Sequence, residues 1–261
     1  MRILLTNDDG IHAPGLWALY NRFVQNDMHS VDVIAPDREQ SAVGHGITLN
    51  RPLRVTGVSM NGAGSGYAVN GTPADCVKLG VLELLESRPD LLISGINPGA
   101  NVGVNINYSG TVAAAKEAAL YGIMAMAVSI QGPPDSYDEA AIFVEKLAAN
   151  IIENGLPAGT FLNVNIPNLP FTKISGIRIS KLSVEFFREY IEKRVDPRNR
   201  TYYWQGTDSL PVSDNPDIDG TVLSEKCISI TPIRCDGTDH AAFEDLKRRG
   251  LDGLEINTKK D

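Results

Sequence analysis

Cysteine is scarce in this chain of 261 residues, with three thiols at Cys76, Cys227 and Cys235. The number is odd, and no two cysteines are separated by just two residues. Neither a disulfide framework nor a structural zinc site is therefore expected to hold the fold together. Cysteine usage of this kind is typical of a reducing compartment, where the thiols stay free.

Long hydrophobic runs are also missing. No apolar stretch approaches the roughly 20 residues that a membrane-spanning helix needs. At the N-terminus only Ile3 to Leu5 are apolar before polar residues begin, which is too short for the core of a signal peptide. Hydrophobic residues still make up 43% of the chain, enough for a sizeable core. We expect a soluble, cytoplasmic protein.

Positive charge is in deficit. The chain has 24 Lys and Arg against 32 Asp and Glu, a formal net charge of -8, and it contains no long basic run. Such a surface does not favour duplex nucleic acid or an anionic membrane as a partner. A phosphate group could still bind, but only through a local device such as a metal ion or a helix N-terminus.

Three familiar motifs of nucleotide and hydrolase chemistry are absent. The chain has no GxxxxGK[ST] phosphate loop and no GxGxxG dinucleotide fingerprint. It also lacks the GxSxG turn that carries a nucleophilic serine. Any phosphate chemistry must therefore proceed without the usual nucleoside-triphosphate machinery.

What the sequence does contain is a regular alternation of apolar runs and helical patterns. The runs predict strands at 2–6, 30–36, 53–58, 67–69, 90–95, 124–130 and 160–167, and the periodicity predicts helices at 13–27, 71–87, 111–122 and 138–153. One helix start is especially clear, with Thr72 as N-cap, Pro73 next and Asp75 three residues after the cap. The alternation predicts an α/β fold with a mostly parallel, doubly wound (Rossmann-like) sheet.

The pattern changes after about Pro170. Gly176–Ser183 alternates as antiparallel strands do, Cys227–Ile233 alternates again, and Glu185–Trp204 mixes charged and aromatic residues. We interpret residues 1–170 as the α/β core that carries the site. Residues 171–261 form a hairpin-rich extension of the same structural unit, ending in a helix over Ala241–Arg249. We expect this extension to be the oligomerisation region.

The first predicted strand ends in two adjacent carboxylates, Asp8 and Asp9, followed by Gly10. Side chains alternate between the faces of a strand, so this pair can converge only if the chain has already turned, as Gly10 indicates. Two carboxylates brought together raise each other's pKa unless a cation neutralises them. A divalent metal ion is the economical explanation, and a solvated turn at a helix start is the alternative.

A second loop at the same predicted edge of the sheet is rich in glycine and asparagine. It spans residues 96–110, and Asn97 comes directly after the end of a strand. Loops of this length without secondary structure are uncommon and often functional. The helix that follows starts at Ser109, Gly110 and Thr111, whose backbone N–H groups could bind an anion, or which could be a plain N-cap.

The loop after the second strand, residues 37–46, offers a hydroxyl at Ser41 and an imidazole at His45. His45 is a candidate acid/base group, with a structural role as the alternative. Carboxylate, amide and hydroxyl oxygens without cysteine favour Mg²⁺, Mn²⁺ or Ca²⁺ over zinc. The sequence therefore suggests one hard divalent ion facing a phosphate.

Five motifs occur in an order and spacing that resemble a known family. They are "TNDDG", "APDREQSAVGH", "GTPADCV", "SGINxGxNxG" and "YSGTV". Together they are similar to the SurE family, the bacterial stationary-phase survival proteins. The likeness is specific from Met1 to about Ile130 and weaker beyond, where "YYW" and "ISITPI" still match.

The resemblance implies a metal-dependent phosphatase that hydrolyses nucleoside 5′-monophosphates, and also 3′-monophosphates and short polyphosphate. It implies one divalent ion, Mg²⁺ or Mn²⁺, per subunit, and homodimers or homotetramers with a swapped C-terminal region. Its motifs assign Asp8, Asp9, Ser41 and Asn97 as metal ligands, with Asp8 and Asp9 catalytic. They assign Asn7, Asn101, Ser109, Gly110 and Thr111 to the phosphate.

Three other classes of protein fit parts of this pattern. A receiver-like signalling module also has an acidic pair after its first strand, but it needs a phospho-acceptor Asp at the end of a later strand. A haloacid-dehalogenase-type phosphatase needs DxDxT, whereas Asp8 is followed directly by Asp9. A catalytically silent nucleotide-binding protein is the third alternative, which an assay of phosphate release would separate from the enzymes.

Overall fold

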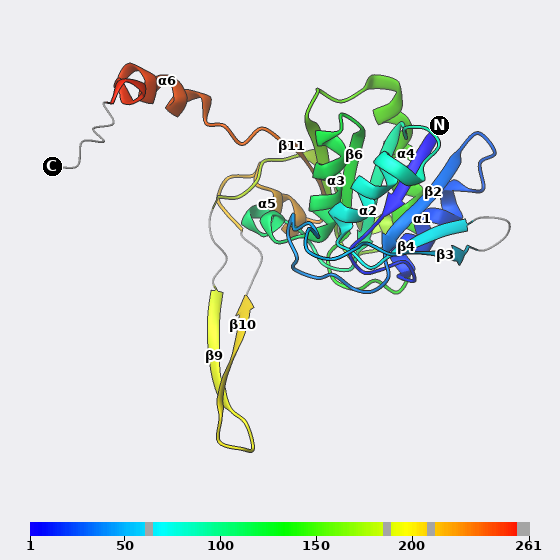
Figure 1. Cartoon of the computed structure of the whole chain (residues 1–261), viewed down its shortest axis with the longest axis horizontal. Coiled ribbons are helices and arrows are strands. Elements are labelled where there is room, and N and C mark those ends of the chain that lie inside the picture. The colour runs from blue at the N-terminus through cyan, green and yellow to red at the C-terminus, as the bar shows by residue number, and fades with distance from the viewer. Residues whose placement is uncertain (61–64, 185–188, 208–211, 255–261) are drawn as a thin grey trace.

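The computed structural model describes residues 1–60, 65–184, 189–207 and 212–254. Its centre is a nine-stranded sheet in the order β3-β4-β2-β1-β5-β6-β7-β11-β8 (Figure 1). The strands of this sheet are β1 (Arg2–Thr6), β2 (Ser30–Pro36), β3 (Val55–Ser59), β4 (Ser65–Val69), β5 (Leu91–Asn97), β6 (Met124–Ile130), β7 (Thr160–Ile166), β8 (Gly176–Ile179) and β11 (Cys227–Arg234). The helices are α1 (Pro14–Phe23), α2 (Pro73–Leu79), α3 (Gly110–Leu120), α4 (Asp138–Asn154), α5 (Asp219–Ser224) and α6 (His240–Arg248).

The strands from β4 to β7 run parallel to one another and form the middle of the sheet. Buried parallel strands should be apolar on both faces, and β1 and β5 are buried except at Arg2 and Asn97. The chain passes from β1 to β2 on one side and later adds β5 on the other. The predicted doubly wound α/β fold is confirmed, and β1 and β5 flank the point where such sheets bind ligands.

The two faces of the sheet bury separate apolar layers. Ile3 and Leu5 of β1 belong to one cluster, together with residues of α1 and α4. Leu4 points to the opposite face and belongs to a second cluster with residues of α2 and α3. Because both faces are covered, only the ends of the strands are left to reach a ligand.

The start of α2 forms as the sequence predicts. The backbone N–H of Asp75 donates to the Thr72 hydroxyl (3.1 Å), and the backbone N–H of Thr72 donates to the Asp75 carboxylate (2.9 Å). This reciprocal pair satisfies two N–H groups that the first turn of a helix otherwise leaves unpaired. After Leu79 the helix continues as a π-turn over Gly80–Leu84.

The segment after Pro170 returns to the main sheet, and here one expectation was wrong. Gly176–Ser183 was expected to pair in antiparallel fashion, but β8 lies parallel to β11, with Ile177 opposite Ile228. The alternation that suggested antiparallel pairing reflects an edge strand with one exposed face, since Ile177 and Ile179 are exposed while the neighbouring β11 is buried. It is β11 that pairs in antiparallel fashion, with β7.

Two parts of the chain extend away from the sheet (Figure 1). One is an antiparallel hairpin of β9 (Glu189–Val195) and β10 (Thr201–Thr207). It overlaps the predicted aromatic and charged segment 185–204 and continues to Thr207, and residues 185–188 of that segment are outside the described residues. The other is α6, close to the predicted terminal helix and capped by Asp239, which accepts from the N–H of Ala242 (2.9 Å). The division at residue 170 and the oligomerisation role stay predictions.

None of the helices in the described ranges is long and apolar enough to cross a membrane. The three cysteines are free thiols; Cys76 and Cys227 are buried and Cys235 is half-buried. Cys76 lies in the apolar layer beneath α2 and α3. The structure thus gives the buried thiols a packing role.

Candidate active site at the carboxyl ends of β1 and β5

Loops that are distant in the sequence meet around the end of β1. The N–H of Gln40, in the loop after β2, donates to the backbone oxygen of Asp8 (2.7 Å), and the Thr111 hydroxyl donates to Oδ1 of Asp8 (2.6 Å). The start of α1 touches the end of β5 so closely that a Cβ at Gly15 would lie 2.1 Å from the backbone oxygen of Ile96. The structure therefore brings the predicted loops together at the edge that the sheet topology selects.

Asn7 holds the turn that follows β1. It is buried, and its amide nitrogen donates to the backbone oxygen of Gly10 (3.0 Å) while its amide oxygen accepts from the N–H of Gly10 (3.1 Å). Gly10 has φ +103°, which a side chain would strain. In this structure Asn7 shapes the turn that presents Asp8 and Asp9, and its contact with phosphate stays a prediction.

Asp8 is buried against the first turn of α3. A Cβ at Gly110 would lie 2.8 Å from the Cβ of Asp8, so only glycine allows this approach. Burial raises the pKa of Asp8 above its usual value, while hydrogen bonds from Thr111 and from the backbone of Gly110 act in the opposite direction. The anion that the helix N-terminus holds here is thus the carboxylate of Asp8, and Ser109 caps the same helix by accepting from the N–H of Val112 (3.2 Å).

Asp9 presents an unsatisfied oxygen beside two other carboxylates. Its Oδ2 is buried and has no hydrogen-bond partner among the described residues. Burial, and then the charges of Asp8 and Glu39, together raise the pKa of Asp9 to about 7. A cation at this point would remove the repulsion and give the oxygen a partner. The site therefore fits a metal ion.

The remaining predicted ligands are neutral oxygens. Ser41 is exposed and its hydroxyl donates to Oε1 of Glu39 (2.5 Å). The amide nitrogen of Asn97 donates to the backbone oxygen of Gly99 (2.6 Å), which leaves the amide oxygen as the end that can face an ion. Across the described ranges, no group of three or more His, Cys, Asp or Glu side chains could hold a metal. A metal here would need hydroxyl or amide oxygens, as the sequence predicts.

Asn101 is clamped by two residues that sequence reasoning missed. Its backbone oxygen accepts from the amides of Asn163 (2.8 Å) and Asn165 (2.9 Å), and its N–H donates to Oδ1 of Asn165 (2.8 Å). Its own amide donates to the hydroxyl of Ser129 (2.9 Å). The sequence feature that could have revealed them is the spacing of the two asparagines in the otherwise apolar strand β7. They are two positions apart, so both side chains lie on one face of the strand.

His45 contacts α3 away from the acidic pair. Its Nε2 lies 2.7 Å from Oε2 of the buried Glu117, whose other oxygen accepts from Lys78 (3.2 Å). The hydrogen bond with His45 is the largest cause that lowers the pKa of Glu117. Glu117 lies about two helical turns, roughly 10 Å, after Gly110. This contact fits the structural alternative, and the acid/base role of His45 stays a prediction.

A pocket of about 450 Å³ opens beside Asp9. Its lining includes Glu39 from the loop after β2, Pro98 from the loop after β5, and Pro133 and Tyr137 from the loop after β6. Burial, and then the charge of Asp9, raise the pKa of Tyr137, as expected for a hydroxyl close to that carboxylate. No motif in the sequence marks Tyr137, which reaches the pocket only through the fold.

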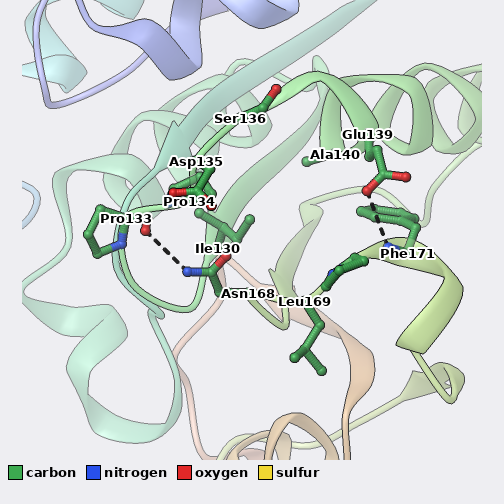
Figure 2. A pocket seen from close by; sticks show the side chains of 11 residues that line it. Ile130, Pro133, Pro134, Asp135, Ser136, Glu139, Ala140, Asn168, Leu169 and Phe171 are labelled. Atoms are coloured by element: carbon green, nitrogen blue, oxygen red, sulfur yellow. Dashed lines mark hydrogen bonds between the residues drawn. The ribbon is translucent and has the colours of Figure 1, made fainter.

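A second cavity, of about 390 Å³, shares Pro133 with this pocket as a lining residue (Figure 2). It is bounded by the loop after β6 and the loop after β7. The amide of Asn168 donates to the backbone oxygen of Pro133 (3.1 Å), and the N–H of Phe171 donates to Glu139 (3.2 Å). The first bond connects the two loops and the second connects the loop after β7 to the start of α4, and neither Asp8 nor Asp9 lines this cavity.

Comparison with known proteins identifies relatives over almost the whole chain. The family model described as "Survival protein SurE" matches residues 3–189. A 5′-nucleotidase SurE from Desulfatibacillum aliphaticivorans is 53% identical over 248 residues, which are 95% of this chain and 97% of the relative. Another, from Syntrophobacter fumaroxidans, is 46% identical over 96% of this chain and 100% of its own length. The crystal structure of the SurE protein from Aquifex aeolicus matches with a TM-score of 0.83 at 35% identity, covering 96% of this chain and 100% of that one.

Proposed function

The chain belongs to the SurE family and is a 5′-nucleotidase, and from this premise we propose that it hydrolyses nucleoside 5′-monophosphates to nucleoside and phosphate with one divalent metal ion per subunit. Mg²⁺ and Mn²⁺ suit the oxygen donors. We extend the proposal to nucleoside 3′-monophosphates and short polyphosphate, which present the same phosphoryl group. The enzyme class sets aside the silent nucleotide-binding and receiver-like alternatives.

The observation that carries the proposal is the buried Oδ2 of Asp9, which lies beside Asp8 and Glu39 and has no hydrogen-bond partner within the described part of the chain. A buried carboxylate oxygen without a donor is costly, and a cation is the partner that both carboxylates need. Asp8 and Asp9 would hold the ion with the hydroxyl of Ser41 and the amide oxygen of Asn97. When bound, the ion would supply Lewis-acid polarisation of the phosphoryl group and a lower pKa for an attacking water.

The protein groups have separable roles in this reaction. Asn101 is fixed by Asn163 and Asn165, so it is preorganised to donate to a phosphoryl oxygen. The turn of Ser109, Gly110 and Thr111 places the N-terminus of α3, which carries a partial positive charge, near the proposed phosphate position. We assign Asn7 to the phosphate site through the turn that it shapes. Asn101 and the start of α3 would oppose the negative charge that develops during transfer.

Two routes differ in the attacking group. In one, water attacks phosphorus; in the other, a carboxylate attacks first and forms a phosphoenzyme. Oδ1 of Asp8 is already held by Thr111, so the covalent route would use another oxygen of the Asp8–Asp9 pair. The configuration at phosphorus of an isotopically chiral phosphate ester separates the routes, because one direct displacement by water inverts it and two successive displacements retain it.

Phosphate release from AMP tests the proposal directly. We expect turnover with Mn²⁺ or Mg²⁺, loss of turnover with excess chelator, and recovery when the ion is restored. Asp8→Asn and Asp9→Asn should each lower kcat by at least about a hundredfold while the circular dichroism spectrum is kept. Undiminished hydrolysis in chelator, or in both variants, would show that the metal proposal is wrong.

We further propose that the chain works as a homodimer or homotetramer through its C-terminal part. The hairpin of β9 and β10 exposes Ile191, Tyr203 and Trp204, which are 63%, 62% and 57% exposed. Exposed aromatic residues of this kind are enriched in protein interfaces. The mass in solution tests this proposal independently of catalysis.

A further inference from the structure

The pocket beside Asp9 has two sides of different character. The order of the strands places the loop after β2 on one side of Asp9 and the loops after β5 and β6 on the other. The β2 side contributes the charged residues Asp37, Arg38 and Glu39. The β5 and β6 side contributes Ile96, two proline rings and the ring of Tyr137. A ligand with its phosphate at Asp9 therefore meets a mainly apolar wall on the second side.

The size and charge of the pocket limit which chemical groups of a substrate this apolar wall can bind. A volume of about 450 Å³ is in the range of small-molecule sites. Apart from Asp9, the ionisable side chains of the pocket are two carboxylates, one guanidinium and the imidazole of His12, and Arg38 already faces Asp37 at 4.0 Å. These charged groups lie away from the β5 and β6 side, which offers a further phosphate no cationic side chain. A neutral, flat and largely apolar leaving group fits better.

Tyr137 has the position that such a group requires. It is the residue before α4, half-buried, with its backbone oxygen accepting from the N–H of Ala141 (2.9 Å). The ring packs partly on the core layer of α1 and α4, and it also lines the pocket with Pro133. A ring anchored in this way can support a stacked base with little loss of side-chain freedom.

On the basis of the proposed function, we propose that the loops after β5 and β6 bind the nucleobase of the substrate, with Tyr137 and the prolines Pro98 and Pro133 as its apolar support. Tyr137 is then a specificity-determining residue that separates nucleotides from other phosphate monoesters. Aromatic and proline faces accept any base, because every base has an apolar face, so the wall selects for the presence of a base.

The test compares AMP with ribose 5-phosphate, which has the same phosphate and sugar but no base. We expect the wild-type enzyme to have a kcat/KM roughly tenfold or more higher for AMP, the order expected from stacking of one base. In Tyr137→Leu, which keeps apolar bulk but removes the ring, KM for AMP should rise roughly tenfold. The values for ribose 5-phosphate should change less than about twofold, and Tyr137→Phe should resemble wild type.

The matched control is Leu169→Ala in the neighbouring cavity of Figure 2, which shares Pro133 with the pocket beside Asp9. It should leave the preference for AMP unchanged. A loss of that preference in Leu169→Ala and not in Tyr137→Leu would overturn the proposal and place the base in the second cavity. Equal losses for both substrates in Tyr137→Leu would also overturn it, because they would mark Tyr137 as merely structural.

Wild-type kinetics provide a readout that does not depend on the folding of any variant. Adenosine should inhibit the hydrolysis of ribose 5-phosphate competitively, and ribose should not. Absence of inhibition by adenosine, or equal kcat/KM for AMP and ribose 5-phosphate, overturns the base site while leaving the phosphatase intact. Failure to hydrolyse either ester would instead refute the proposed function itself.

Discussion

The hydroxyl of Thr111 donates a 2.6 Å hydrogen bond to Oδ1 of Asp8, joining the first turn of α3 to the end of β1 across 103 positions of sequence. Thr111 is fully buried. The bond fixes one carboxylate oxygen and leaves the other side of the Asp8–Asp9 pair to face a ligand. The orientation of the proposed metal ligand therefore depends on a helix that comes much later in the chain.

Replacing Thr111 by valine tests this dependence with almost no change of shape. Thr111→Val removes a hydrogen bond to a buried carboxylate, which should lower the free energy of unfolding by about 1–3 kcal/mol. Affinity for Mn²⁺ should fall roughly 10- to 100-fold, as for other groups that orient a metal ligand. Calorimetric titration and thermal unfolding measure the two effects. Thr231→Val is the control, since Thr231 bonds a neutral hydroxyl of Ser180 (2.7 Å), and it should leave metal affinity unchanged.

Gly110 is predicted to tolerate no side chain. In Gly110→Ala the new Cβ would lie 2.8 Å from the Cβ of Asp8, so the helix start and the carboxylate must separate. We expect a loss of stability of about 1–3 kcal/mol and a fall in kcat of at least about tenfold. Gly57→Ala in β3, where a Cβ meets nothing within 4 Å, should change stability by less than about 1 kcal/mol. Similar behaviour of the two variants would contradict this explanation.

Metal binding should depend on pH through Asp9. The pKa of Asp9 is about 7 in the metal-free fold against an ordinary value of 3.8, so between these values the folded state binds a proton that the unfolded state has lost. Stability of the metal-free protein should therefore fall as pH rises from about 4 to 7, and Asp9→Asn should remove that contribution.

The affinity for a metal ion should change in the opposite sense. Below pH 7 the ion must displace the proton on Asp9, so the apparent affinity should fall up to about tenfold for each unit by which the pH is lowered. Calorimetric titration of the metal ion in buffers of different ionisation enthalpy measures how many protons are released on binding. If the number of protons released were the same at pH 6 and pH 8, the raised pKa of Asp9 would be contradicted.

His45 is expected to position its loop rather than to transfer a proton. Its ring contacts the buried Glu117 at 2.7 Å, so His45→Gln, which keeps a donor for that carboxylate, should lower kcat less than about tenfold. His45→Leu should destabilise the fold by about 1–3 kcal/mol, because it leaves Glu117 with Lys78 alone. The pH profile of kcat distinguishes the roles. A loss of a hundredfold or more in His45→Gln, with disappearance of one limb of the profile, would identify a general acid.

The exposed aromatic residues of the hairpin predict self-association. Trp204→Glu should shift the mass in light scattering toward the monomer, because a charge in the centre of an apolar interface is costly to bury. Leu82→Glu, at a residue that is 63% exposed on the π-turn after α2, is the control and should leave the mass unchanged. A wild-type chain that is monomeric at micromolar concentration would refute the oligomer.

Much of the architecture follows from local pattern. The bounds of β1, β2 and β6 agree with the apolar runs, and the capping box at Thr72 forms as predicted, because each depends on neighbouring residues only. The parallel direction of β8 could not be read in the same way. Alternation of exposed and buried residues reports which face of a strand meets solvent, and it carries no information on the direction of the neighbour.

For the site, the sequence by itself determined the inventory: an acidic pair after the first strand, neutral oxygen donors in two loops, and a helix start suited to an anion. Only the tertiary structure decided the partners. It placed the first turn of α3 against Asp8, left Oδ2 of Asp9 without a donor among the described residues, held Asn101 with two asparagines of β7, and brought Tyr137 to the pocket beside Asp9. These contacts join residues far apart in the chain, so they depend on the order in which strands assemble in the sheet, which local periodicity does not encode.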